Sequence, residues 1–148
     1  MDYKQIITRD DITTKLTKRG YNLNDNGILD AVHFTTLEDA VDDFLQGCTD
    51  SINDLITTYR GKAWTDKFLQ DMSISGMTNA NAKQQEYHNE YIRALLEQCI
   101  FTYDNGDANA SASKDNTNNA YSPKAVQILW NMNILRWWYG KKQLRTTY

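Results

Sequence analysis

Hydrophobic residues recur at helical spacing in two long segments of the chain. In residues 36–61 they follow one another in steps of three and four for about five turns, with Thr36 as the expected N-cap and Gly61 as the expected end. These positions are Val41, Phe44, Leu45, Cys48, Ile52, Leu55, Ile56 and Tyr59. In residues 82–103 the apolar positions cover a wider arc, which is typical of a helix at the centre of a bundle or at an interface. They are Tyr87, Tyr91, Ile92, Ala94, Leu95, Leu96, Cys99, Ile100 and Tyr103.

Three shorter helices are predicted from local signals. Residues 8–11, Thr-Arg-Asp-Asp, form a capping-box pattern that starts a helix ending near Arg19. Residues 64–72 have aromatic residues at helical spacing, and Ser122 followed by Pro123 is a strong start signal for a last helix. The residues of that last helix that we expect to face the core are Ala125, Val126, Leu129, Trp130 and Met132.

Two other segments are predicted to be loops. Residues 21–34 are rich in Asn, Asp and Gly and leave room for one helical turn at 28–32. Residues 104–120 contain no Leu, Ile, Val or aromatic residue, so burial cannot offset the entropy of ordering them unless a partner does so. No alternating strand pattern stands out. We therefore predict an all-α small helical bundle, residues 1–135, with a long polar, mobile loop at about 104–121. An extended C-terminal docking tail, residues 136–148, completes the chain.

The charges divide unevenly along the chain. Its 148 residues fit one domain and carry a net charge of −3. Acids outnumber bases between Asp10 and Asp54, whereas only bases follow Tyr121. A chain with this polarity can attract copies of itself head to tail, although charge placed only for solubility gives the same pattern. Four acids lie off the apolar stripe of residues 36–61 and are expected to face water or a partner: Asp42, Asp43, Asp50 and Asp54.

The two cysteines, Cys48 and Cys99, lie on apolar helical faces, so we expect buried free thiols. Without a paired cysteine framework, a reducing compartment of synthesis is favoured. The first residues do not form a signal-peptide pattern, and no apolar run approaches the length of a membrane span. We expect the protein to be made in the cytoplasm and to remain there or in a particle assembled there.

No catalytic constellation is found. His33 and His88 are far apart, and residues 86–90 match neither the Glu-x-x-His nor the His-Glu-x-x-His helical metal motif. The acids of residues 39–43 share a helix face, but no second acidic helix completes a metal site. We predict that the protein is not an enzyme and needs no cofactor or metal. If the protein were an enzyme, its site would lie in the helical bundle and combine the 86–90 and 39–43 segments.

The C-terminal tail is the strongest candidate for a binding role. Its expected docking residues are Arg136, Trp137, Trp138, Tyr139, Lys141, Lys142 and Arg145. Trp, Tyr and Arg dominate the hot spots of protein interfaces, which favours a protein partner. The same residues could stack on nucleic-acid bases and contact phosphates, or simply cover the end of the bundle. The acidic rest of the chain disfavours general DNA affinity.

Several of these segments together resemble a known family. Residues 96–107 (Leu-Glu-Gln-Cys-Ile-Phe-Thr-Tyr-Asp-Asn-Gly-Asp) are followed by the polar segment and then by residues 121–125 (Tyr-Ser-Pro-Lys-Ala). This order is similar to that of the head–tail connector proteins of tailed bacteriophages, also called adaptor or head-completion proteins. The capped start at residues 8–12 and the Ile-Thr-Thr-Tyr-Arg-Gly segment at 56–61 add to the likeness. Residues 21–34, residues 104–120 and the aromatic tail have no counterpart in that family.

The resemblance implies a virion structural protein. Such a protein forms a ring, typically of about twelve copies, beneath the portal in the virion neck. The ring joins the DNA-filled head to the tail and lines the DNA exit channel. The implied partners are the portal protein, a stopper or tail protein and other copies of the chain, with packaged DNA only in passing contact and no membrane. The tail would then dock on the portal or a neighbour, and Asp42, Asp43, Asp50 and Asp54 would face the channel or the next subunit.

Two other hypotheses stay open at this point. One is a small helical nucleic-acid-binding or regulatory protein that uses the basic aromatic tail. The other, among phage neck proteins, is the β-rich stopper, which strong helix content would exclude.

Overall fold

Five α-helices and one short 3-10 helix make up the part of the chain that the computed structural model describes, residues 1–23, 36–115 and 121–135. In chain order they are η1 (Tyr3–Gln5), α1 (Arg9–Lys18), α2 (Leu37–Arg60), α3 (Lys62–Met72), α4 (Ala82–Asp115) and α5 (Pro123–Asn131). These described residues contain no β-strand, so the predicted all-α fold class is confirmed. The expected turn at 28–32, His33 and the tail at 136–148 lie outside them.

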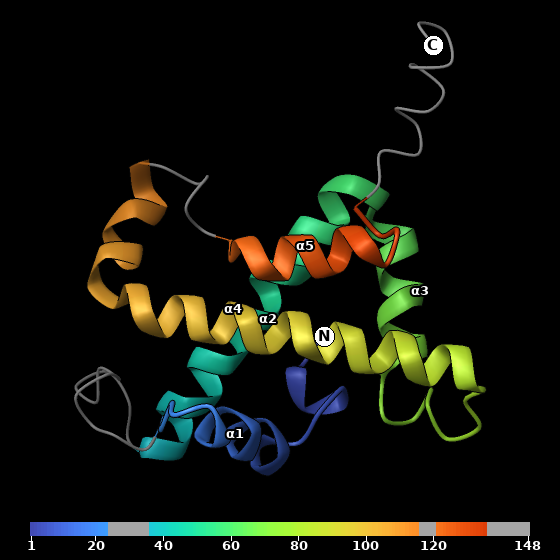
Figure 1. Cartoon of the computed structure of the whole chain (residues 1–148), viewed down its shortest axis with the longest axis horizontal. Helices are drawn as coiled ribbons and strands as arrows, with labels where there is room; N and C mark the ends of the chain where they lie inside the picture. Colours follow the sequence, from blue (N-terminus) through green and yellow to red (C-terminus); the bar gives the residue numbers. More distant parts are fainter. Residues whose placement is uncertain (24–35, 116–120, 136–148) are drawn as a thin grey trace, which may run out of the picture.

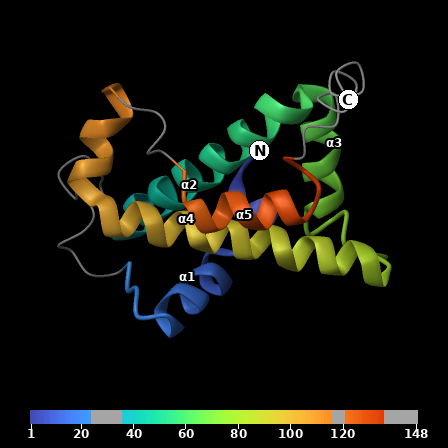
Figure 2. The same ribbon diagram turned by 45° about the horizontal axis from the view of Figure 1, so that its top comes forward.

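Helix α4 is the central element, and α1, α2, α3 and α5 all pack against it. Figure 1 shows α2 crossing behind α4, while α5 runs beside α4 in the opposite direction. Figure 2 shows α1 and α5 on different sides of α4. The wide apolar surface predicted for this helix is confirmed, since Tyr91, Ala94 and Leu95 are completely buried.

The apolar stripe of α2 supplies the other half of the core. Val41, Leu45, Cys48, Ile52 and Ile56 are buried, each by 97% or more, as the three-and-four spacing predicted. The remaining predicted positions, Phe44, Leu55 and Tyr59, are partly buried at the edges of the stripe. Burying a side chain of this kind contributes roughly 1.5–3 kcal/mol, so this stripe is a main source of the fold's stability.

A polar pair lies inside this hydrophobic contact. The hydroxyl of Tyr91 on α4 donates to Oδ1 of Asn53 on α2, at 2.5 Å, and both side chains are buried. Burial raises the pKa of Tyr91 far above its ordinary value, so the hydroxyl remains a donor. Because each buried polar group needs its partner, the pair sets how α2 and α4 align.

The local signals for helix starts were reliable. Thr8 accepts a hydrogen bond from the Asp11 amide, Thr36 from the Asp39 amide, and Ser122 from the Ala125 amide. Each side chain satisfies one of the backbone donors that a helix N-terminus leaves unpaired. Between α2 and α3, Gly61 has φ of +88°, which only glycine adopts without strain. This turn lets α3 begin at Lys62, two residues before the predicted start.

Helix α4 continues well beyond the predicted end at Tyr103, so the expected polar loop is wrong for residues 104–115. Alanines alternate with polar residues there, and alanine has the highest helix propensity. Gly106 lowers helix stability by about 1 kcal/mol, which a long helix that is already nucleated tolerates. The Asn105 side chain also donates to the Phe101 carbonyl one turn earlier. Figures 1 and 2 show this last, orange part of α4 turning away from the axis of the rest.

Helix α5 packs on α4 through a slightly different set of side chains from the one predicted. Ala125, Leu129 and Met132 are buried as expected, and Val126 is partly buried. Trp130, by contrast, is 41% exposed, whereas Ile128, which was not predicted, is buried. The positions 125, 128, 129 and 132 form one narrow stripe at helical spacing, and Trp130 lies off it.

The Tyr91–Asn53 pair leads to a stability prediction. Tyr91→Phe removes the hydroxyl and leaves the Asn53 side chain buried without its partner, which should lower the free energy of unfolding by about 1–3 kcal/mol. Urea denaturation followed by far-UV circular dichroism measures the change. The control is Tyr21→Phe, which removes an exposed hydrogen bond to Asp104 and should have a much smaller effect. Equal destabilisation by the two substitutions would show that the buried pair has no special role.

Candidate functional site

Asp42 forms a partly buried ion pair with Arg9 of the same chain. It therefore differs from the exposed acids of α2. Its carboxylate accepts hydrogen bonds from Nε and Nη2 of Arg9, at 2.7 and 2.5 Å, and from the hydroxyl of Tyr3, at 2.5 Å. The Arg9 hydrogen bonds hold the pKa of Asp42 well below its ordinary value. Burial and the neighbouring carboxylate raise the pKa of Tyr3. The expectation that Asp42 faces water or a partner is therefore corrected, because η1 and α1 fold over this part of α2.

The other three predicted acids of α2, Asp43, Asp50 and Asp54, are exposed. They are spaced by seven and then four residues, so they lie within about 40° of one another around the helix. We call these three residues the acid face. Asp50 also accepts a hydrogen bond from the Gln46 side chain, at 2.8 Å. The acid face thus places three negative charges along one exposed side of α2.

The seven predicted docking residues, from Arg136 to Arg145, lie outside the described residues. The structure does define where this segment starts. Nε of Arg60, the last residue of α2, donates to the Ile134 carbonyl at 2.8 Å, and its Nη2 donates to the Asn133 carbonyl. The Arg60 guanidinium also lies 4.7 Å from the ring centroid of Trp64. Burial lowers the pKa of Arg60, although a guanidinium stays charged in proteins.

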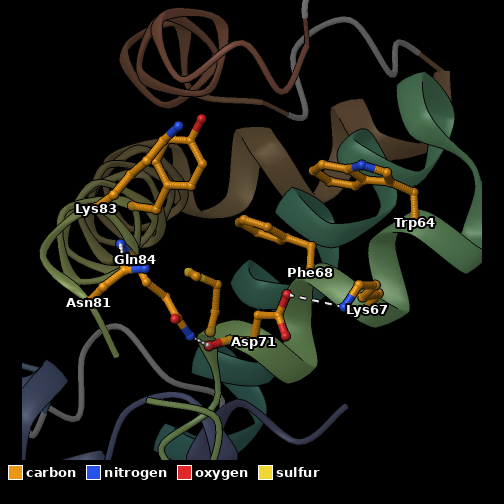
Figure 3. A pocket seen from close by; sticks show the side chains of 9 residues that line it. Trp64, Lys67, Phe68, Asp71, Asn81, Lys83 and Gln84 are labelled. Atoms are coloured by element: carbon orange, nitrogen blue, oxygen red, sulfur yellow. Dashed lines mark hydrogen bonds and ion pairs between the residues drawn. The ribbon is translucent and has the colours of Figure 1, made fainter. Parts of the chain in front are cut away.

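A mostly apolar cleft of about 340 Å³ lies next to this point, between α3 and the first turns of α4. Figure 3 shows Trp64 and Phe68 on the α3 side and Lys83 and Gln84 on the α4 side. The residues that line it are Trp64, Lys67, Phe68, Asp71, Met72, Asn81, Lys83, Gln84 and Tyr87. The polar lining residues form the rim of the cleft. There Lys67 forms an ion pair with Asp71 at 3.8 Å, and the Gln84 side chain donates a hydrogen bond to the Asp71 backbone carbonyl.

Stacked aromatic rings join this cleft to the core. Trp64 lies parallel to Phe68, with ring centroids 5.2 Å apart, and Phe68 meets Tyr91 edge to face at 5.4 Å. Tyr91 and Phe68 are buried, whereas Trp64 is 36% exposed. The cleft is therefore a rigid aromatic surface anchored on the core. The four-residue spacing of Arg60, Trp64 and Phe68 was a visible sequence signal. The cleft itself could not be predicted, because Tyr87 comes from a helix distant in sequence.

Among the groups considered for catalysis, His88 has a structural contact. Nδ1 of His88 lies 3.0 Å from the Met72 carbonyl oxygen, and burial lowers the pKa of the ring. His88 is thus partly buried, because α3 ends against this side of α4. Within residues 1–23, 36–115 and 121–135, no group of three or more His, Cys, Asp or Glu side chains is arranged to hold a metal.

Cys48 and Cys99 are both buried free thiols, as predicted. Cys99 interacts with Cys48, and this contact together with burial raises the pKa of Cys99 well above its ordinary value. A reactive cysteine needs the opposite shift, since the thiolate is the nucleophile. The pair therefore serves as packing between α2 and α4.

None of the helices in the described segments has both the length and the apolar character that crossing a membrane requires. Comparison with protein-family models, with curated proteins and with solved structures found no match to this chain. The structural surfaces that stand out are therefore the acid face, the cleft, and the point beside it from which residues 136–148 continue.

The Asp42 ion pair predicts how stability depends on pH. A carboxyl whose pKa is depressed by folding stabilises the fold above its unfolded pKa of about 3.9, and this contribution is lost as the pH falls below that value. Asp42→Asn should lower the free energy of unfolding by about 1–2 kcal/mol at pH 7. It should also lose less stability than the unmodified chain between about pH 4 and pH 2. Urea denaturation across this range measures both effects.

Asp43→Asn is the matched control, since it removes the same charge from the exposed neighbour of Asp42. Its acid-induced loss of stability should parallel that of the unmodified chain. A parallel loss in Asp42→Asn as well would contradict the role assigned to the ion pair.

Proposed function

We propose that the protein is a ring-forming structural component of a bacteriophage neck, an adaptor that binds beneath the portal and joins the head to the tail. The observation that carries this proposal is the acid face of α2 in a chain whose residues after Tyr121 include only bases. A closed ring requires that each copy present one surface and accept a different one. Opposite charges on the two surfaces favour that head-to-tail contact over a symmetric dimer.

The rest of the fold supports this role. Helices α2 and α4 form the core, and Arg60 at the end of α2 bonds the Asn133 and Ile134 carbonyls after α5, so the last described residues before 136 are held at a defined place. A segment rich in Trp, Tyr and Arg that starts from a fixed point is suited to docking on a neighbouring protein. The family resemblance implies a portal partner and about twelve copies for the ring. The tail has no counterpart in that family, so its contact with the portal is our own inference from its aromatic and basic residues.

The acid face has a second use in this proposal. Duplex DNA carries a dense negative charge, and proteins bind it mainly by placing Lys and Arg against its phosphates. Asp43, Asp50 and Asp54 would repel those phosphates if they lined the exit channel, so DNA could slide past without being held. Alternatively, the same three acids contact the basic tail of the next copy. Each of these two arrangements requires that the copies form a ring.

The proposal predicts that the tail aromatics bind the portal. The full-length variant Trp137→Ala/Trp138→Ala/Tyr139→Ala should bind the portal protein encoded by the same genome at least about tenfold more weakly, because interface energy concentrates in such side chains. Biolayer interferometry measures the affinity, and far-UV circular dichroism should show unchanged helix content. The control is Trp130→Ala, which removes an exposed tryptophan of α5 and should leave portal binding intact. Unchanged binding by the triple variant would refute the docking role.

A DNA gel shift separates the proposal from the nucleic-acid-binding alternative. The adaptor should not shift duplex DNA at low salt, because the exposed acids oppose binding. A salt-dependent shift that requires Arg136, Lys141 and Lys142 would favour the alternative.

A further inference from the structure

We propose that the cleft between α3 and α4 binds the aromatic segment 136–139 of its own chain. The occupant is thus one indole ring of Trp137 or Trp138, seated against Trp64, Phe68 and Tyr87. The proposal concerns the isolated chain and goes beyond the adaptor role, since it holds whether or not the protein belongs to a phage neck.

The residues just before 136 lie beside the cleft. Arg60 contacts the Asn133 and Ile134 carbonyls and lies over Trp64, on one wall of the cleft. The hydroxyl of Tyr87, on the opposite wall, donates to the Met132 carbonyl at 3.4 Å. The last described turn therefore contacts Tyr87 on the α4 wall directly, and it contacts Arg60, which lies over Trp64 of the α3 wall. Figures 1 and 2 show the red end of α5 next to α3.

Residues 136–139 are tethered closely enough to reach the cleft at a high effective concentration. An extended chain advances at most about 3.6 Å per residue, so Trp137 and Trp138 stay within about 11 Å of Leu135. A tether this short gives an effective concentration in the millimolar range or above, so even a weak contact is populated. A second copy or a separate peptide lacks this advantage at ordinary protein concentrations.

The chemistry of the cleft suits an aromatic occupant. Its floor is apolar and aromatic, and Trp64 is 36% exposed although Phe68 and Arg60 lie against its ring, so the uncovered part of the indole can contact another ring. At the rim, Nζ of Lys83 lies 6.0 Å from the Tyr87 ring centroid, which places a cation where it can also meet an incoming indole. A volume of about 340 Å³ is at the lower end for small-ligand sites, so it suits one or two side chains better than a folded partner.

The contact has a consequence for the proposed function. A tail segment held in the cleft keeps its aromatic rings covered in the free subunit, and docking on a partner requires their release. The cleft and the partner then compete for the same residues, which limits premature self-association.

Disulfide cross-linking in the full-length chain tests the proposal. One variant combines Lys67→Cys at the cleft rim with Gly140→Cys just beyond the aromatic residues, and leaves Lys83, Trp137, Trp138 and Tyr139 unchanged. The control combines Lys15→Cys with Gly140→Cys. Lys15 is exposed on α1, on a different side of α4 from the end of α5. Mild oxidation with copper phenanthroline is followed by non-reducing electrophoresis and intact mass measurement. The native Cys48 and Cys99 are buried and present in both variants.

The cleft variant should form an intramolecular disulfide at least about tenfold faster than the control, as expected for a tethered segment held near its site. Adding Trp137→Ala/Trp138→Ala to the cleft variant should reduce the rate to that of the control.

Equal rates in the cleft variant and the control would overturn the proposal. A cross-link that forms only between two chains would assign the cleft to a neighbouring copy and overturn it as well. A cross-linking rate that stays the same after Trp137→Ala/Trp138→Ala would show that the aromatic rings do not hold the segment, and it would also overturn the proposal. None of these results depends on the portal, so failure here is distinct from failure of portal binding.

Discussion

The packing of α2 against α4 is the constraint on which the rest of the fold depends. The stripe of α2 and the broad apolar surface of α4 bury their largest side chains against each other, and the Asn53–Tyr91 hydrogen bond lies inside this contact. A buried polar pair tolerates little displacement, because sliding the helices would leave both groups without partners. The crossing of the two helices is therefore specified by one hydrogen bond as well as by apolar area.

The other elements take their places from that crossing. Tyr91 supports Phe68, and Phe68 supports Trp64, so α3 and its cleft are positioned by the same residue that aligns the core. Arg60 then joins the end of α2 to the last turn after α5. On the other side, Arg9 and Tyr3 reach Asp42 and close the N-terminal segment over α2. The tail segment thus begins beside a cleft whose shape is determined from the core outward.

Local sequence signals predicted most of this fold, and long-range contacts account for the failures. The caps at Thr8, Thr36 and Ser122 and the apolar spacing of α2 depend on residues a few positions apart, so the sequence shows them directly. Asp42 looked exposed because the arginine that binds it is 33 positions away. Helix α4 extends past its predicted end for a different reason, since alanine-containing polar residues can continue a helix without an apolar stripe. Of the candidate site, the acid face was predictable, whereas the cleft arises from two helices that only the fold brings together.

We propose that this chain assembles as a ring on a portal. Mass photometry of the purified chain, alone and mixed with the portal protein of the same genome, tests this assembly most directly. Portal particles should gain mass in multiples of 17.1 kDa, up to a single saturated species with about twelve added copies. Portal particles whose mass stays unchanged at a large excess of the chain would contradict it.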